Sequence, residues 1–129
     1  MNITILAVGK LKEKYWTDAV KEYEKRLNGY CSINIIELKE SLLRNNPSAA
    51  DEEAVKKKEG EEILAKIKKN DFVITLEING KTLSSTELAK KIENLGIEGK
   101  SNIIFVIGGS LGLSKDVSSR SNFKLHFRQ

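Results

Sequence analysis

The sequence predicts an α/β fold, a mostly parallel sheet with helices on both faces. Short β-branched segments alternate along the chain with longer amphipathic segments, as in β-α-β units. Segments 72–76 and 103–107 are apolar on both of their alternating faces, which is typical of strands covered on both sides. The length of 129 residues, with 40% apolar residues and no internal repeat, predicts a single domain over 1–129.

The first strand and helix follow from apolar periodicity. Residues 2–8 predict a buried strand that ends at Gly9. Residues 13–28 predict a helix, because apolar side chains recur there every three or four positions, and Asn28-Gly29 is a typical helix end. Residues 32–38 predict the second strand.

A long helix is expected next. Ser48 and Asp51 have the spacing of a helix start, and the helix is expected to run to near Asn70. Its lysine-rich end suits the negative end of the helix dipole, and Lys56–Lys58 is interpreted as a solvated face. Gly60 weakens this helix without ending the pattern.

The third β-α unit begins with a short apolar strand over 72–76, followed by a turn over 77–81. Ser84 and Glu87 have capping-box spacing and predict a helix that runs to about Leu95. Gly96 and Gly99 are then expected to end the helix.

The last elements begin with the most strand-like segment of the chain, 102–107, which runs directly into Gly108–Gly112. A short helix over about 114–120 and a final strand over 123–127 complete the expected order β-α-β-α-β-α-β-α-β.

Composition limits the classes of function. No stretch reaches the roughly 18 apolar residues of a membrane span. Cys31 is the only cysteine and His126 the only histidine, which favours a reducing compartment and argues against a structural zinc site. Residues 1–64 hold 11 basic and 12 acidic side chains, but residues 65–129 hold 11 and 6. This basic half would suit a polyanion, although a solvated lysine-rich surface is the simpler interpretation of charge alone.

Two strand ends are candidate binding positions, because ligands of open α/β sheets bind beyond the carboxyl ends of central strands. One is Leu76 with the turn after it, and the other is Gly108–Gly112, where glycines would let a ligand approach the backbone. The glycines alone could equally form a plain turn. No nucleophile arrangement is recognisable around Ser110, and Asp116 is more typical of a residue that caps or solubilises a helix start.

Several segments together resemble the ribosomal RNA large subunit methyltransferase H family (RlmH, YbeA or OrfX) of the SPOUT class. The resemblance spans Met1 to about Leu125, nearly the whole chain. The segments that carry it are Ile3–Lys12, Tyr23–Leu27, Glu37–Lys39, Leu76, Gly80-Lys81 and Phe105–Gly112.

The resemblance implies a SPOUT-like α/β knot and a homodimer. It implies a cytoplasmic enzyme that needs neither a metal nor a membrane. Its cofactor would be S-adenosylmethionine (S-adenosyl-L-methionine), which the family's contacts would place at Leu76, Gly108 and a loop beginning near Phe127. Its substrate would be N3 of a pseudouridine in helix 69 of 23S rRNA, within the ribosome. The resemblance indicates no catalytic base among residues 1–129.

The carboxyl end departs from the family pattern. Relatives continue with a loop and a helix that threads the knot, whereas this sequence ends Phe127-Arg128-Gln129. We therefore expect the knot-threading helix to be absent and the strand faces around 103–107 to be exposed. His126 is interpreted as a product of the altered end and not as a general base.

Two other classes of function stay open at this stage. One is a non-catalytic RNA- or ribosome-binding remnant of the family, which would use the basic second half. The other is an unrelated small nucleotide-binding module.

Overall fold

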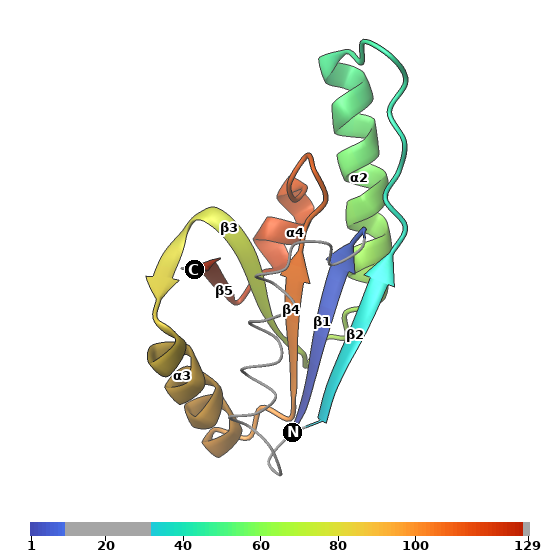
Figure 1. The fold of residues 1–129 in the computed structure, drawn as a ribbon. Coiled ribbons are helices and arrows are strands. Elements are labelled where there is room, and N and C mark those ends of the chain that lie inside the picture. The colour runs from blue at the N-terminus through green and yellow to red at the C-terminus, as the bar shows by residue number, and fades with distance from the viewer. Residues whose placement is uncertain (10–31, 128–129) are drawn as a thin grey trace.

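The computed structural model describes residues 1–9 and 32–127, and Figure 1 shows their arrangement. The helix predicted over 13–28 and Cys31 lie outside the described residues, as do Arg128 and Gln129. The described elements are β1 (Asn2–Val8), β2 (Ser32–Leu38), α2 (Ala49–Ala65), β3 (Phe72–Leu83), α3 (Ser85–Ile97), β4 (Asn102–Ile107), α4 (Lys115–Arg120) and β5 (Phe123–Phe127).

The five described strands form one sheet in the order β2-β1-β4-β3-β5, and every neighbouring pair is parallel. The predicted α/β class with a parallel sheet is confirmed. β4 lies at the centre, where Ile103 pairs with Ile3 of β1 on one side and with Phe72 of β3 on the other. The carboxyl ends of β1, β4 and β3 therefore meet at one edge of the sheet.

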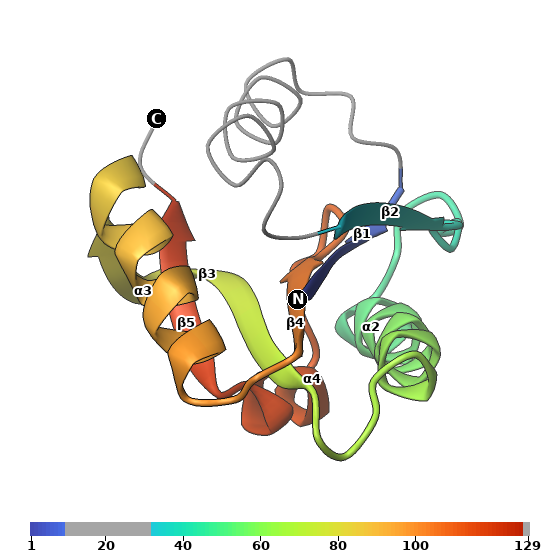
Figure 2. The ribbon, with the colours of Figure 1, turned by 90° about the horizontal axis from the view of Figure 1, so that it is seen from below.

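Alternate side chains of the strands pack into two separate cores, one on each face. Figure 2 shows α3 beside β5, and α2 on the other side of β4. The first core joins α3 to the sheet through Ile3, Ile74, Leu88, Ile92, Leu95, Ile103 and Leu125. The second core joins α2 and α4 to the sheet through Leu6, Val8, Ile63, Val73, Ile104, Val106 and Val117. Helices thus cover both faces, as the doubly apolar strands predicted.

The third strand is longer than predicted. β3 continues to Leu83, and the expected turn over 77–81 is an irregularity within it, because Leu76 and Lys81 both pair with Leu125 of β5. Gly80 explains how this fits: a Cβ there would lie 2.6 Å from the backbone carbon of Leu125. The strand can bulge and then rejoin its partner only because residue 80 has no side chain.

α2 is shorter than predicted and ends at Ala65, not near Asn70. After it, the Lys66 N–H donates to the Ile63 carbonyl, and the Asp71 carboxylate accepts the Lys68 N–H at 2.7 Å. Arg120 of α4 donates to the Lys68 and Asp71 carbonyls, both at 3.0 Å. The local hydrogen bonds of Lys66 and Asp71 and the tertiary ones from Arg120 hold this segment outside the helix, so the lysines expected in its last turn lie beyond it.

Both predicted helix starts are confirmed. Ser48 caps α2 and Ser84 caps α3: each hydroxyl accepts the backbone N–H of the acid three residues later, and the carboxylate of that acid accepts the serine N–H. α3 extends two residues further than expected, to Ile97, and the chain then turns at Gly99, whose φ is +89°. None of the helices among residues 32–127 is long and apolar enough to cross a membrane.

The expectation of exposed strand faces around 103–107 is wrong. Ile103 and Val106 have no exposed surface, and Ile104 is 6% exposed. Phe105 and Ile107 are half-buried. The reason is the central position of β4, which α3 covers on one face and α2 with α4 on the other.

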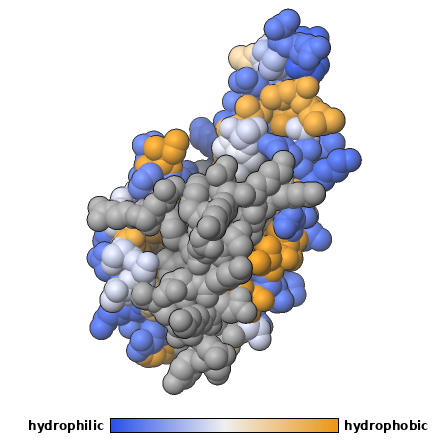
Figure 3. Space-filling model, in the orientation of Figure 1, coloured by the Kyte–Doolittle hydropathy of each residue, from blue (hydrophilic) through white to orange (hydrophobic). Residues whose placement is uncertain are grey.

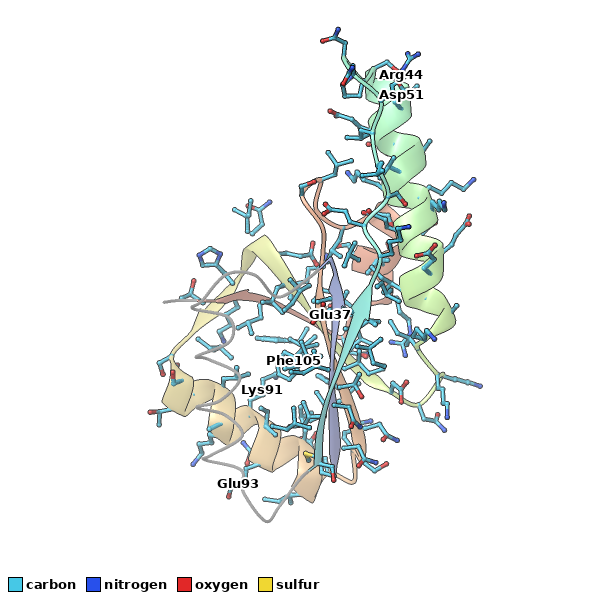
Figure 4. All side chains as sticks on the ribbon, turned by 45° about the vertical axis from the view of Figure 1, so that its right-hand side comes forward. Glu37, Arg44, Asp51, Lys91, Glu93 and Phe105 are labelled. Carbon is cyan, nitrogen blue, oxygen red and sulfur yellow. The ribbon has the colours of Figure 1, made fainter. Side chains whose placement is uncertain are left out.

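α2 and the segment before it project beyond the carboxyl ends of β1 and β2 (Figure 1). At the far end, the Arg44 guanidinium pairs with Asp51 at 2.7 Å, as Figure 4 shows. Figure 3 shows apolar surface on this projection among hydrophilic residues, and Leu42 there is 92% exposed.

α3 carries Lys91, whose ammonium lies 4.2 Å from the centre of the Phe123 ring at the start of β5.

The close approach at Gly80 gives a first prediction. Gly80→Ala should lower the free energy of unfolding by about 1–3 kcal/mol, because a methyl group would press against the β5 backbone. Urea unfolding measures the loss. The neighbouring exposed Asn79→Ala serves as control and should change stability by less than about 0.5 kcal/mol. Equal stability of the two variants would show that the bulge tolerates a side chain.

Candidate functional site

Two of the predicted ligand residues come together at the carboxyl edge of the sheet. β3 and β4 pair in parallel up to Thr75 and Val106. Leu76 is the next residue of β3, and Gly108 follows two residues beyond Val106 on β4, so both lie at the same edge. Leu76 also pairs with Leu125 of β5 and is half-buried. The structure thus places the two candidate positions on neighbouring strands.

Phe127 does not join them through the strand pairing. Its backbone pairs with Leu83, beyond the irregularity in β3, and not with Leu76. The residue of β5 that lies beside Leu76 is Leu125. The described residues therefore bring together Leu76 and Gly108 and place Phe127 further along the edge strand.

Gly108–Gly112, the glycine loop, folds into a tight turn after β4. The Gly112 N–H donates to the Gly109 carbonyl at 3.0 Å, and the two residues form an isolated bridge. Gly112 has a φ of +83°, which strains any residue with a Cβ, and no atom lies within 4 Å of the position a Cβ would take. At Gly108 a Cβ would lie 3.0 Å from the Gly112 backbone. Glycine is thus needed for the shape of the loop, which leaves bare backbone beside Gly112.

The glycine loop rests on two carboxylates. Glu40, which follows β2, accepts hydrogen bonds from the Ser110 N–H and the Ser110 hydroxyl, both at 2.9 Å. A Cβ on Gly109 would lie 3.0 Å from Glu40 Oε1 and 3.4 Å from Glu59 Oε1. The loop therefore packs closely on side chains from the β2–α2 segment and from α2.

Glu59 is the buried member of this pair. Only 4% of its surface is exposed, and its Oε2 accepts the Ser41 N–H at 3.0 Å. Burial raises the pKa of Glu59 above its usual value; the hydrogen bond from Ser41 opposes this, and the negative charges of Glu40 and Glu62 add to it. The ionised form is thus costly at neutral pH.

The next residue, Gly60, brings α2 against the start of α4. A Cβ on Gly60 would overlap the Ser114 hydroxyl and lie 3.3 Å from Val117 Cγ2. Ser114 caps α4 by accepting the Val117 N–H at 3.3 Å. Sequence reasoning noted Gly60 only as a weakness in a helix. A glycine inside a helix, preceded by an acid, was the available sign of a close contact.

A hydrogen-bonded network fixes the first half of β3 to α4 and to Ser121 after it. The buried Thr75 hydroxyl lies 2.6 Å from Glu77 Oε2 and 2.8 Å from the Ser121 hydroxyl. The Ser118 hydroxyl donates to Glu77 Oε1 at 2.9 Å. Glu77 directly follows Leu76, so this network holds the predicted ligand position from below.

Comparison with known proteins identifies the family. Residues 1–129 match the family described as predicted SPOUT methyltransferase. A protein of Clostridium novyi named ribosomal RNA large subunit methyltransferase H is 58% identical over 127 residues, which is 98% of this chain and 80% of the relative. Its namesake in Clostridium beijerinckii is 54% identical, and a putative one in Methanococcus vannielii is 56% identical, over the same shares. The chain belongs to the ribosomal RNA large subunit methyltransferase H family.

Other polar residues considered from the sequence lie away from the glycine loop or support helices. In this SPOUT methyltransferase, His126 pairs with Thr82 on the edge strand and is exposed. Asp116 lies in the first turn of α4, where a negative charge suits the helix dipole. Within residues 1–9 and 32–127, no three His, Cys, Asp or Glu side chains are grouped to hold a metal ion.

Gly60→Ala should destabilise the methyltransferase by about 1–3 kcal/mol, although alanine favours helices, because the methyl group would push α2 away from Ser114. Gly96→Ala in α3 is a matched control, since its Cβ would meet only the mobile tip of the Met1 side chain. That variant should be neutral, or more stable by up to about 1 kcal/mol. Thermal and urea unfolding compare them, and a Gly60→Ala variant as stable as Gly96→Ala contradicts the packing argument.

Glu59→Gln should raise the melting temperature at pH 7. Because the folded-state pKa is raised, the contribution of Glu59 to stability is full below its ordinary value of 4.5 and is lost as the pH rises through the folded value. Glutamine keeps the acceptor for Ser41 without the charge. The advantage of the variant should therefore shrink as the pH falls toward 4, in melting curves from pH 4 to 7.5. An advantage that grows toward acid would contradict the assigned direction.

Proposed function

We propose that this chain is a single SPOUT-like domain that binds S-adenosylmethionine at the ends of β3 and β4 and methylates N3 of a pseudouridine in helix 69 of 23S rRNA. The parallel pairing that sets Leu76 beside the glycine loop carries this proposal. The names of the relatives support an rRNA substrate. Basic side chains also outnumber acidic ones in the second half of the chain, and this positive charge suits the binding of RNA phosphates.

The residues at this edge fit such a cofactor. The bare backbone beside Gly112 leaves space that any side chain would fill, so a flat ring system can approach the peptide groups. Leu76 offers an apolar surface next to it, half-buried between β4 and β5. We assign Leu76 and Gly108 to the adenosine part, and Phe127 to the rim on β5.

S-adenosylmethionine supplies a methyl group that its sulfonium has already activated, so no metal is required. The residues of the chain then have to hold the acceptor nitrogen in line with that methyl group and exclude water. N3 of pseudouridine carries a proton, which must leave near the transfer step. In this proposal the Thr75–Glu77 network keeps the end of β3 rigid, so that Leu76 stays in place during the reaction.

The proposed setting is the cytoplasm, with the enzyme as a homodimer acting on the ribosome. The alternative of a non-catalytic RNA-binding protein rests on the same basic second half of the chain. The two functions differ in one measurable property, the binding of the cofactor. Ribosome binding that weakens with salt, without any cofactor binding, would favour the alternative.

Isothermal calorimetry with S-adenosylmethionine tests the cofactor site. The unmodified chain should bind, and Gly108→Ala should weaken binding by about tenfold or more, because its methyl group would press on the Gly112 backbone and reshape the loop. Gly96→Ala is the matched control and should bind normally. If the unmodified, folded chain binds no cofactor, the proposed enzyme function is wrong.

Methyl transfer is tested separately. Ribosomes that lack the modification are incubated with the chain and labelled S-adenosylmethionine, and the helix 69 fragment is examined by mass spectrometry. The expected product is one added methyl group on a pseudouridine of that fragment. Cofactor binding with a methyl group at another site would overturn the proposed substrate but not the cofactor site.

A further inference from the structure

Glu59 is a buried acid whose hydrogen bonding partner is a neutral backbone group. Its Oε2 accepts the Ser41 N–H at 3.0 Å, and its residue is 4% exposed. Among residues 1–9 and 32–127, the hydrogen-bond donor to this carboxylate is uncharged, and such a donor recovers little of the lost hydration. An apolar side chain of similar volume would avoid this cost, so packing alone does not explain a hydrogen-bond acceptor at this position.

The position of Glu59 points to the glycine loop. The residue it holds, Ser41, directly follows Glu40, and Glu40 accepts both the N–H and the hydroxyl of Ser110 at 2.9 Å. Hydrogen bonds to an ionised acceptor are the stronger kind, so they fix the tip of the loop. By accepting the Ser41 N–H, Glu59 therefore fixes the backbone next to Glu40, whose carboxylate holds the loop.

Two further observations place the turn of α2 that carries Glu59 close to the glycine loop and to α4. Glu59 Oε1 lies 3.4 Å from where a Cβ of Gly109 would be, so a side chain at residue 109 would meet the carboxylate. Gly60, the next residue, brings α2 against Ser114, which begins α4 immediately after the loop. Two successive residues of α2, Glu59 and Gly60, thus lie near the glycine loop and against the start of α4.

We propose that Glu59 is a positioning residue, which acts through Ser41 and Glu40 to hold the glycine loop in the shape that binds the cofactor. This inference rests on the proposed function for its consequence, although not for its geometry. Glu59 itself does not touch the cofactor. The acceptor oxygen matters for positioning, whereas the negative charge does not.

Three variants separate these roles. Glu59→Leu removes the acceptor and keeps a similar volume, Glu59→Gln keeps an acceptor oxygen, and Glu61→Leu changes an exposed acid of the same helix as a control. The first measurement is the amide proton and nitrogen shift of Ser110 by NMR, without cofactor. Its hydrogen bond to the Glu40 carboxylate should move the amide proton downfield, and Glu40→Ala gives the shift that marks the loss of this bond.

We expect Glu59→Leu to move the Ser110 amide toward its position in Glu40→Ala, and Glu59→Gln and Glu61→Leu to leave it unchanged. In calorimetry, Glu59→Leu should weaken S-adenosylmethionine binding about tenfold while the Glu59→Gln rescue stays within about twofold of the unmodified chain. Melting curves identify any variant that fails to fold. If Glu59→Leu does not fold, the NMR comparison is made between Glu59→Gln and Ser41→Pro, because Ser41→Pro removes the N–H donor instead of the acceptor.

Unchanged Ser110 shifts in a folded Glu59→Leu variant overturn the positioning role, whatever the cofactor does. Equal weakening by Glu59→Gln and Glu59→Leu also overturns it, since charge rather than the acceptor would then matter. If the unmodified chain binds no cofactor but the Ser110 shifts change as expected, the proposed function fails and the positioning of the loop stands.

Discussion

The burial of β4 between β1 and β3 is the constraint on which the rest of the structure depends. Both faces of β4 are covered, so its residues from Ile103 to Ile107 are all apolar, and its hydrogen bonds are satisfied by two parallel neighbours. A strand in this position delivers its carboxyl end to the middle of the sheet edge. The glycine loop begins there, beside the end of β3, and this placement makes the edge suitable for a ligand.

The loop combines a rigid base with a bare surface. Its turn is closed by its own backbone, while Glu40, Glu59 and the capped start of α4 support it from below. This support lowers the stability of the fold, because the Glu59 carboxylate near the loop is kept out of water. Such a compromise is more typical of a site than of a core, where an apolar side chain would pack as well.

Much of the fold could be predicted from local patterns. The doubly apolar segments indicated the central strands, and the serine and acid pairs at Ser48 and Ser84 marked two helix starts correctly, since caps depend only on neighbouring residues. The end of α2 was predicted wrongly because the segment after Ala65 is held outside the helix partly by Arg120, about 50 residues away, which hydrogen bonds to the Lys68 and Asp71 carbonyls. The length of β3 was missed for the same reason, since residues 81–83 are held by pairing with β5 and not by their own propensity.

By itself the sequence determined the fold class, the two strand ends where a ligand would be sought, and the resemblance to a methyltransferase family. These depend on periodicity and on glycine, which are properties of short stretches of chain. Only the tertiary structure decided that Leu76 and Gly108 lie on neighbouring strands while Phe127 pairs with Leu83, and that Glu59 lies near the loop while Gly60 packs against the start of α4. Those facts follow from the order of strands in the sheet and from the close approach of two helices, which join residues far apart in the chain and leave little trace in local sequence.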